Sequence, residues 1–238
     1  MKTKTNAKVA TTKTTSRKER GGDDAPSENE LLTKKSINVP LVSFSKLTLR
    51  IVGETPLLCH AWSTKALRMI EEKQQKKAGT DGEGKSRLPK EARDPDKEVD
   101  ACYYYTSDNR LGFPARAIKK ACVEAAPLVG LNKKTVRAGF FILGEDVLPL
   151  DLKSAPAKRT DVVRLPSIGR PADIRYRPEF KDWSILLKLK FNRSLFTEEQ
   201  IINLIRWAGS AIGIGEWRTE RDGTHGCFDI DFNSLVTA

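Results

Sequence analysis

The chain has 238 residues and a net charge of +11, with a pI near 9.5, so an anionic partner is favoured: nucleic acid first, an anionic membrane surface second. No apolar run approaches the roughly 18–20 residues of a membrane helix, and the N-terminus lacks the apolar segment of a signal peptide. The four cysteines are scattered without a Cys-x-x-Cys pair, which is typical of a reduced, cytoplasmic protein.

The first 38 residues are rich in Lys, Thr, Ser, Asp and Gly and predict a disordered basic tail. Residues 1–20 carry seven Lys or Arg against Glu19, so removing their net +6 from +11 leaves +5 for the rest of the chain. The tail either reaches for phosphates or only keeps the protein soluble. We expect the folded domain to span residues 39–238.

The folded part begins with alternating polar and apolar residues over 46–51, which predict a half-buried β-strand. A turn containing glycine and proline ends this strand. Ser63 is then placed to cap a short, mostly polar helix over about 64–77. Residues 78–99 form a charged segment too long for a simple turn, so we expect an insertion there, either disordered or functional.

The middle of the chain predicts a hairpin, a helix and further strands. Residues 100–114 have the pattern of a hairpin that turns at 107–109. Pro114 suits the first turn of the next helix, whose apolar stripe repeats at helical spacing until Pro127 ends it. Residues 137–152 have the pattern of two further short strands.

The last third of the chain completes the expected fold. Residues 153–180 are punctuated by prolines and predict a second insertion, a protruding hairpin or arm. Residues 183–191 alternate as a strand, Thr197 and Gln200 match a capping box for the following helix, and a final strand covers 227–232. This order predicts an α+β fold with a ferredoxin-like (RRM-like) core that carries long insertions.

Three cations mark the start of the helix that follows Pro114. Arg116, Lys119 and Lys120 stand at i, i+3 and i+4, so they are expected to share a face. The helix dipole disfavours cations in this first part of a helix by about 0.3–1 kcal/mol. A bound phosphate backbone would turn that cost into a binding site, and the alternative is a solvated basic face.

A glycine-rich loop, GIGEWRTERDGTHG, follows the last predicted helix. Its glycines, Gly213 and Gly215 among them, permit backbone conformations that other residues resist, and exposed amides in such a loop can form an anion site. Arg218 and Arg221 are expected to add guanidinium contacts to phosphates, while Trp217 either stacks on a base or fills the core. The alternative is a plain hairpin with surface arginines.

The arm over 153–180 is rich in arginine. We expect these side chains either to track a phosphate backbone or to dock on a neighbouring subunit. The arm's candidate residues are Arg159, Arg164, Arg170, Arg175 and Arg177.

The open face of the predicted sheet lacks the Phe or Tyr that stacks on bases in an RNA-recognition sheet. Its expected residues are instead Lys46, Arg50, Lys188 and Lys190. With the last strand beside the first, Asp229 and Asp231 are expected to pair with Lys46 and Arg50. We therefore place nucleic acid on loops and helix ends.

No motif indicates catalysis, a metal or a cofactor, and we expect a protein that is not an enzyme. His60 and His225 each lie close to a cysteine, Cys59 and Cys227, but the spacing fits no usual zinc pattern. His60 or a loop aspartate could still support RNA cleavage, an alternative that no pattern favours. The aspartates concerned are Asp94, Asp96 and Asp161.

Three blocks in this order resemble the RAMP superfamily, the ferredoxin-like RNA-binding subunits of CRISPR effector complexes. LRIVGETPLLCH is similar to their first strand and turn. RLGFPARAIKKACVEAA is similar to their strand-to-helix segment, with Lys119 at or beside the lysine position. IGIGEWRTERDGTHGCFDI is similar to their glycine-rich loop and last strand. The likeness is closest to the subunits that polymerise along guide RNA, and small phage-encoded proteins carry similar blocks.

The resemblance implies a protein that binds single-stranded nucleic acid, RNA favoured over DNA, and assembles side by side into a helical filament. The arm over 153–180 would then reach the next subunit, and other CRISPR effector subunits are possible partners. Two further functions stay open: a phage protein that mimics or blocks a host CRISPR complex, and a phage factor that anneals single strands.

Overall fold

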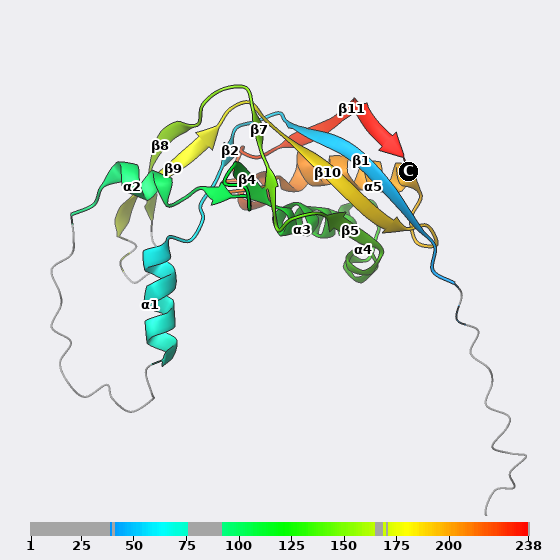
Figure 1. Cartoon of the computed structure of the whole chain (residues 1–238), viewed down its shortest axis with the longest axis horizontal. Helices are drawn as coiled ribbons and strands as arrows, with labels where there is room; N and C mark the ends of the chain where they lie inside the picture. The colour runs from blue at the N-terminus through cyan, green and yellow to red at the C-terminus, as the bar shows by residue number, and fades with distance from the viewer. Residues whose placement is uncertain (1–38, 40, 76–91, 165–168, 170, 238) are drawn as a thin grey trace, which may run out of the picture. The chain divides into compact units, whose positions relative to one another are not determined.

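The computed structural model divides into two units, Met1–Leu41 and Val42–Ala238. It describes residues 39, 41–75, 92–164, 169 and 171–237 (Figure 1). The tail expected over 1–38 lies outside these residues, as does the greater part of the insertion expected over 78–99. The second unit holds all the helices and strands given below.

The central sheet has the ferredoxin-like topology that the sequence predicts. Its chain order is β1 (Phe44–Gly53), α3 (Ala115–Ala125), β5 (Phe140–Leu143), β10 (Trp183–Asn192), α5 (Glu198–Trp207) and β11 (Phe228–Thr237). The strands lie in the order β11-β1-β10-β5, and each neighbouring pair is antiparallel. The last strand therefore lies beside the first, and the second lies at the far edge. The expected α+β class with a ferredoxin-like core is confirmed.

One face of this sheet forms the core. Leu47, Leu49 and Ile51 of β1 are buried and lie opposite buried Leu189, Leu187 and Ile185 of β10. α3 and α5 run along this face, as Figure 1 shows, and their apolar stripes are buried there. Burying each such Leu or Ile side chain contributes about 1.5–3 kcal/mol.

Local caps fix where the helices begin. Thr197 and Gln200 form the expected capping box of α5, with Oγ1 of Thr197 accepting from the Gln200 amide at 3.2 Å. Ser63 caps α1 (Thr64–Gln75) as predicted, its Oγ accepting from the Ala66 amide at 3.2 Å. Pro114 is the last residue of β4 (Leu111–Pro114) and the N-cap of α3, one residue earlier than the first-turn position expected.

Two smaller sheets carry the predicted hairpins. β3 (Tyr104–Tyr105), β4 and β6 (Val147–Pro149) form one sheet. β2 (Leu57–Leu58), β9 (Ala172–Phe180) and β8 (Ala157–Arg164) form the other, in which β8 and β9 are the hairpin of the expected arm. β7 (Asp151–Leu152) pairs with the start of β10.

Two helices occupy segments expected to be loop or strand. α2 (Pro95–Asp100) lies within the predicted insertion, and Oδ1 of Asp94 caps it by accepting from the Asp96 amide at 3.1 Å. α4 (Lys133–Gly139) precedes β5 and is capped by Asn132, which accepts from the Lys134 amide at 2.8 Å. An Asp or Asn cap starts both helices, and this short-range signal outweighs the charged or apolar composition that suggested otherwise.

The cross-strand charge pairs differ from those expected. Arg50 lies opposite Asp231 in the register, but its guanidinium pairs with Asp151 of β7. Asp229 instead accepts from Arg206 of α5 at 2.8 Å, and this bond holds the pKa of Asp229 below its usual value. β7 thus supplies the partner of Arg50, and α5 supplies the partner of Asp229, in place of the neighbouring strand.

No helix in the described part of the chain combines the length and apolar character needed to cross a membrane.

Candidate nucleic-acid interface

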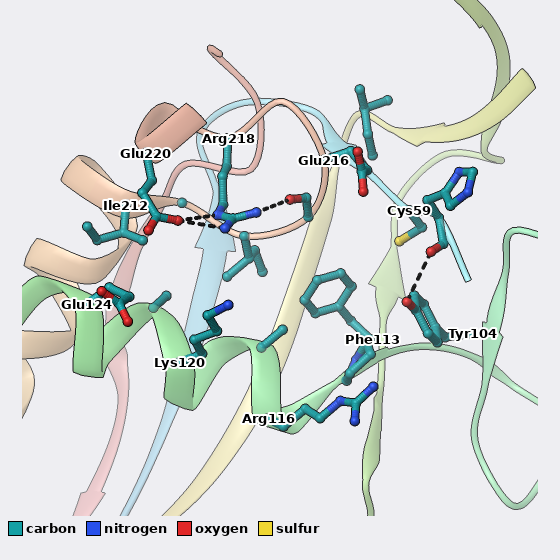
Figure 2. Close-up of a pocket in the computed structure, with 18 residues that line it drawn as sticks. Cys59, Tyr104, Phe113, Arg116, Lys120, Glu124, Ile212, Glu216, Arg218 and Glu220 are labelled. Atoms are coloured by element: carbon teal, nitrogen blue, oxygen red, sulfur yellow. Dashed lines mark hydrogen bonds and ion pairs between the residues drawn. The ribbon is translucent and has the colours of Figure 1, made fainter. Parts of the chain in front are cut away.

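One side of α3, from Arg116 to Glu124, and the glycine-rich loop line one pocket of about 230 Å³, which we call the cleft (Figure 2). The structure thus brings together the two segments predicted to hold phosphates. Of the predicted site residues, those that line the cleft are Arg116, Lys120, Gly213, Gly215 and Arg218. Cys59 and His60, which follow β2, and Tyr104 and Phe113 of the small sheet complete much of its wall.

Arg116 and Lys120 are the available cations of the cleft. They stand one helical turn apart and are exposed. The ion pairs found among the described residues include neither Arg116 nor Lys120. Both are therefore open to an incoming anion.

Arg218, by contrast, is held by its own loop. Its Nε and Nη2 both donate to Oε2 of Glu220, at 2.9 and 2.6 Å, and Nη1 donates to the Gly215 carbonyl at 3.2 Å. These dashed contacts in Figure 2 neutralise the guanidinium and fix the loop's shape. Arg221 is exposed in the short 3₁₀ helix η3 (Thr219–Arg221), outside the residues that line the cleft.

The glycines shape the loop rather than present free amides to an anion. Gly213 and Gly215 have φ of 72° and 81°, in the left-handed region that favours glycine. A Cβ on Gly215 would lie 2.5 Å from the Leu58 carbonyl oxygen. The amides of Gly213 and Glu216 donate to backbone carbonyls at 2.8 and 3.0 Å. The anion site expected from this loop's amides is therefore largely occupied by the chain itself.

Lys119 does not line the cleft. Its Nζ donates to the Arg137 carbonyl at 3.2 Å and lies 4.6 Å from the centroid of the Phe141 ring. Burial lowers the pKa of this ammonium group. The basic face expected for α3 is thus divided: Arg116 and Lys120 face the cleft, while Lys119 lies on the side of β5.

Two arginines of the β8–β9 hairpin serve its internal packing. Arg177 is fully buried, and its Nη2 donates to Asp161 at 2.8 Å, while its Nε has no partner among the described residues. Arg159 donates to Asp161 at 2.9 Å and to Glu179 at 2.8 Å, and the bond to Asp161 raises the pKa of Arg159. Arg177 is therefore removed from the surface that a phosphate chain could touch.

Trp217 joins the glycine-rich loop to this hairpin. Its ring lies 5.2 Å from the guanidinium carbon of Arg159 and 5.1 Å from that of Arg177. The residue has a φ of 52° and is 37% exposed, so it fills the junction and leaves an edge to solvent. Of the two expected roles, packing is the one that these contacts describe.

The remaining arm arginines lie apart from this junction. Arg164 is exposed on β8, and Arg170 lies outside the described residues. Arg175 of β9 lines a second hollow of about 670 Å³, which shares His60 and Glu216 with the cleft. We call it the aromatic hollow because Trp62 and Tyr176 also line it.

Sequence reasoning did not single out the aromatic side chains of this hollow. Trp62 is 65% exposed and lies two residues after His60, in the segment between β2 and α1. The ring of Tyr176 carries the guanidinium of Arg93 at 5.7 Å. A tryptophan two residues from a histidine, in the segment between the first predicted strand and the first predicted helix, was the signal that could have found this site.

The histidines and cysteines do not converge on one centre. Nδ1 of His60 lies 3.8 Å from Sγ of Cys102, whereas His225 packs edge-on against Trp217. Burial lowers the pKa of His60. In the part of the chain that the structure describes, no three His, Cys, Asp or Glu side chains are placed to hold a metal ion.

No protein-family model and no curated protein matches the chain. Among solved structures, it is similar to a chain of "Cryo-EM structure of the Type III-B Cmr-beta bound to cognate target RNA", with a TM-score of 0.43 and 10% identity. The alignment covers 82% of this chain and 60% of that chain, so the protein spans less than two thirds of its neighbour's length. The assignment of the ferredoxin-like core rests on the strand order itself.

Proposed function

We propose that this protein binds single-stranded nucleic acid, RNA in preference to DNA, along the cleft and the aromatic hollow, and that it does so without catalysis. One observation carries the proposal: Arg116 and Lys120 present unpaired charge at a cleft that adjoins a hollow lined by Trp62. Cations that hold phosphates beside aromatic rings that stack on bases are the usual means of binding single strands.

The chemistry of the cleft and the aromatic hollow favours a strand over a compact anion. The cleft offers ammonium and guanidinium groups, while the adjoining hollow offers the exposed ring of Trp62 and the guanidinium of Arg175. Phosphate contacts carry no sequence information, so binding should be largely independent of sequence and should weaken steeply with salt. The preference for RNA rests on the resemblance of the three sequence blocks to the RAMP superfamily.

Side-by-side assembly is the second part of the proposal. Val162 and Ile174 lie directly opposite each other on the β8–β9 hairpin and are 70% and 42% exposed. An exposed apolar pair on a hairpin is suited to contact another protein surface. In the proposed filament this pair packs against the next subunit, and in the alternative of a phage protein that enters a host complex it packs against that complex.

The test compares two charge-reversed variants in gel-shift titrations with uridine RNA. Arg116→Glu with Lys120→Glu should lower affinity by about a hundredfold or more, since two phosphate contacts become repulsive. The control, Lys153→Glu with Lys181→Glu, makes the same change in net charge at two exposed positions outside both hollows.

Equal affinity of the two variants would remove the cleft from the binding site. Absence of RNA binding by the unaltered protein would overturn the function as a whole. Sizing chromatography with and without ribonuclease tests assembly: a large species that depends on RNA supports the filament. Shortening of the labelled RNA by pure protein would contradict the absence of catalysis.

A further inference from the structure

The face of the sheet opposite the helices carries an uncompensated group of lysines. Lys46 of β1 lies directly opposite Lys190 of β10, and Thr48 lies opposite Lys188. Since side chains alternate along a strand and Leu47 and Leu189 are buried, these lysines point away from the core. We call the surface made by Lys46, Lys188 and Lys190, with Phe44, the lysine face.

Like charges placed directly opposite each other across two strands destabilise a sheet. The charge of Arg50, on the same side of β1, is neutralised by an ion pair with Asp151. Among the described residues, the ion pairs found include none for Lys46, Lys188 or Lys190. The fold therefore keeps an electrostatic cost here that a single acidic residue would remove.

The aromatic rings of this face are covered by cations. Phe44 and Phe141 meet edge to face, with centroids 6.5 Å apart. Nζ of Lys190 lies 4.1 Å from the Phe44 centroid, and Nζ of Lys119 lies 4.6 Å from that of Phe141. A base that stacks on the side of a ring where an ammonium group lies has to displace that group. The groups offered outward are thus cationic, which selects phosphates over bases.

We propose that the lysine face is a second binding surface, which takes the sugar–phosphate backbone of a single strand that also occupies the cleft. This rests on the proposed function, because the ligand is the same strand. Lys119 and Lys120 are consecutive on α3, yet one lies against Phe141 beside the lysine face and the other lines the cleft. α3 therefore carries cations toward both surfaces, and a strand longer than the cleft has a second set of phosphate contacts available.

The test uses the full chain and two labelled uridine RNAs, one of about 5 nucleotides and one of about 30, at several salt concentrations. The variant is Lys46→Gln with Lys188→Gln and Lys190→Gln. Affinity for the long RNA should fall about tenfold to a hundredfold, and the slope of log affinity against log salt should become shallower by about 2, since each phosphate contact contributes about 0.7. Affinity for the short RNA should stay within about twofold.

The matched control is Lys97→Gln with Lys153→Gln and Lys181→Gln, three exposed lysines on α2 and near the β9–β10 turn. It has the same net charge as the lysine-face variant and should bind long RNA like the unaltered protein. Thermal unfolding of both variants checks that the fold is retained, and removal of the Lys46–Lys190 repulsion should not lower the melting temperature.

The outcomes separate the second surface from the function on which it rests. If the lysine-face variant and its control bind long RNA equally while Arg116→Glu with Lys120→Glu binds weakly, the lysine face is not a binding surface and the cleft stands. If the unaltered protein binds neither RNA, both proposals fall. Equal losses for short and long RNA in the lysine-face variant would also overturn the proposal, because the loss would then reflect net charge alone.

Discussion

The cleft and the lysine face both lie on a basic protein, but the cleft pairs part of its charge and leaves Arg116 and Lys120 unpaired, whereas the lysine face has no ion pair among the described residues. In the cleft, Arg218 is neutralised by Glu220, and Glu124 is paired with Lys133. On the lysine face, Lys46 and Lys190 face each other without an acidic neighbour among the described residues. Net charge alone does not distinguish the two, whereas the pairing of each cation does.

The two surfaces distinguish cations that stabilise the fold from cations that remain available to bind phosphates. Arginines near the cleft and hairpin, such as Arg177 and Arg218, make several hydrogen bonds in fixed geometry, which suits a planar guanidinium. The cations without such contacts lie at the ends of long, flexible side chains. We therefore expect substitutions of paired cations such as Arg177 to change stability, and substitutions of unpaired cations such as Arg116 and Lys120 to change binding.

The largest effect expected on the arginine side is that of Arg177→Ala. The substitution removes one of the cations that neutralise Asp161, a carboxylate that is only 6% exposed. Breaking a buried ion pair by removing one partner costs about 3–5 kcal/mol. Chemical denaturation should show a loss of this size, and the junction between Trp217 and the hairpin should loosen.

A double variant decides whether this loss is electrostatic. Arg177→Met with Asp161→Leu removes both charges and keeps apolar volume, so it should recover a large part of the stability. If the double variant is as unstable as Arg177→Ala, packing of the guanidinium on Trp217 would be the cause instead.

Much of the fold follows from the sequence because its signals are local. The alternation in β1 and β10 and the capping box of α5 each depend on a few neighbouring residues. The ferredoxin-like order follows once these elements are placed in sequence. α2 and α4 do not follow from the sequence although Asp94 and Asn132 carry their caps, since each helix is short and has a single capping side chain as its signal.

The candidate site was only partly predictable because it depends on contacts distant in sequence. Helical spacing placed Lys119 with Arg116 and Lys120, but it cannot say that β5 lies on the side of Lys119. In the hairpin, the register sets Arg159 opposite Arg177, and Asp161 lies on the same side between them. The sequence shows an arginine-rich segment, whereas only the pairing reveals that Arg177 is buried.

A smaller effect is expected from Lys133→Gln, which frees an acid at the cleft. The hydrogen bond from Lys133 holds the pKa of Glu124 below its usual value. A carboxyl with a lowered folded pKa stabilises the fold above its unfolded pKa, and this contribution is lost as pH falls through the folded value. The variant should lose about 0.5–1 kcal/mol at neutral pH, and this difference should shrink as pH falls below the unfolded pKa of about 4.3 and vanish below the folded pKa of Glu124.

The same variant tests the electrostatics of the cleft. An unpaired Glu124 carboxylate beside Lys120 should weaken RNA binding several-fold at low salt, and the effect should fade as salt rises. The double variant with Glu124→Gln is the control and should bind RNA at least as well as the unaltered protein. A loss of binding that persists in the double variant would place Lys133 itself in contact with RNA.

The smallest change in stability, and the sharpest contrast between fold and binding, is expected for Lys46→Glu. It replaces a repulsive cross-strand pair with an attractive one opposite Lys190 and should stabilise the protein by a few tenths of a kcal/mol, within the range of about 0.2–1 kcal/mol for such pairs. Binding of long RNA should nevertheless weaken, because the substitution lowers the net charge of the lysine face by two and so reduces its attraction for phosphates. Denaturation curves and gel-shift titrations of one preparation measure both. If the lysine face binds phosphates, a substitution there that raises stability has to lower the affinity for RNA. A variant that is more stable and binds RNA as before would therefore mean that these lysines only keep the open sheet face solvated.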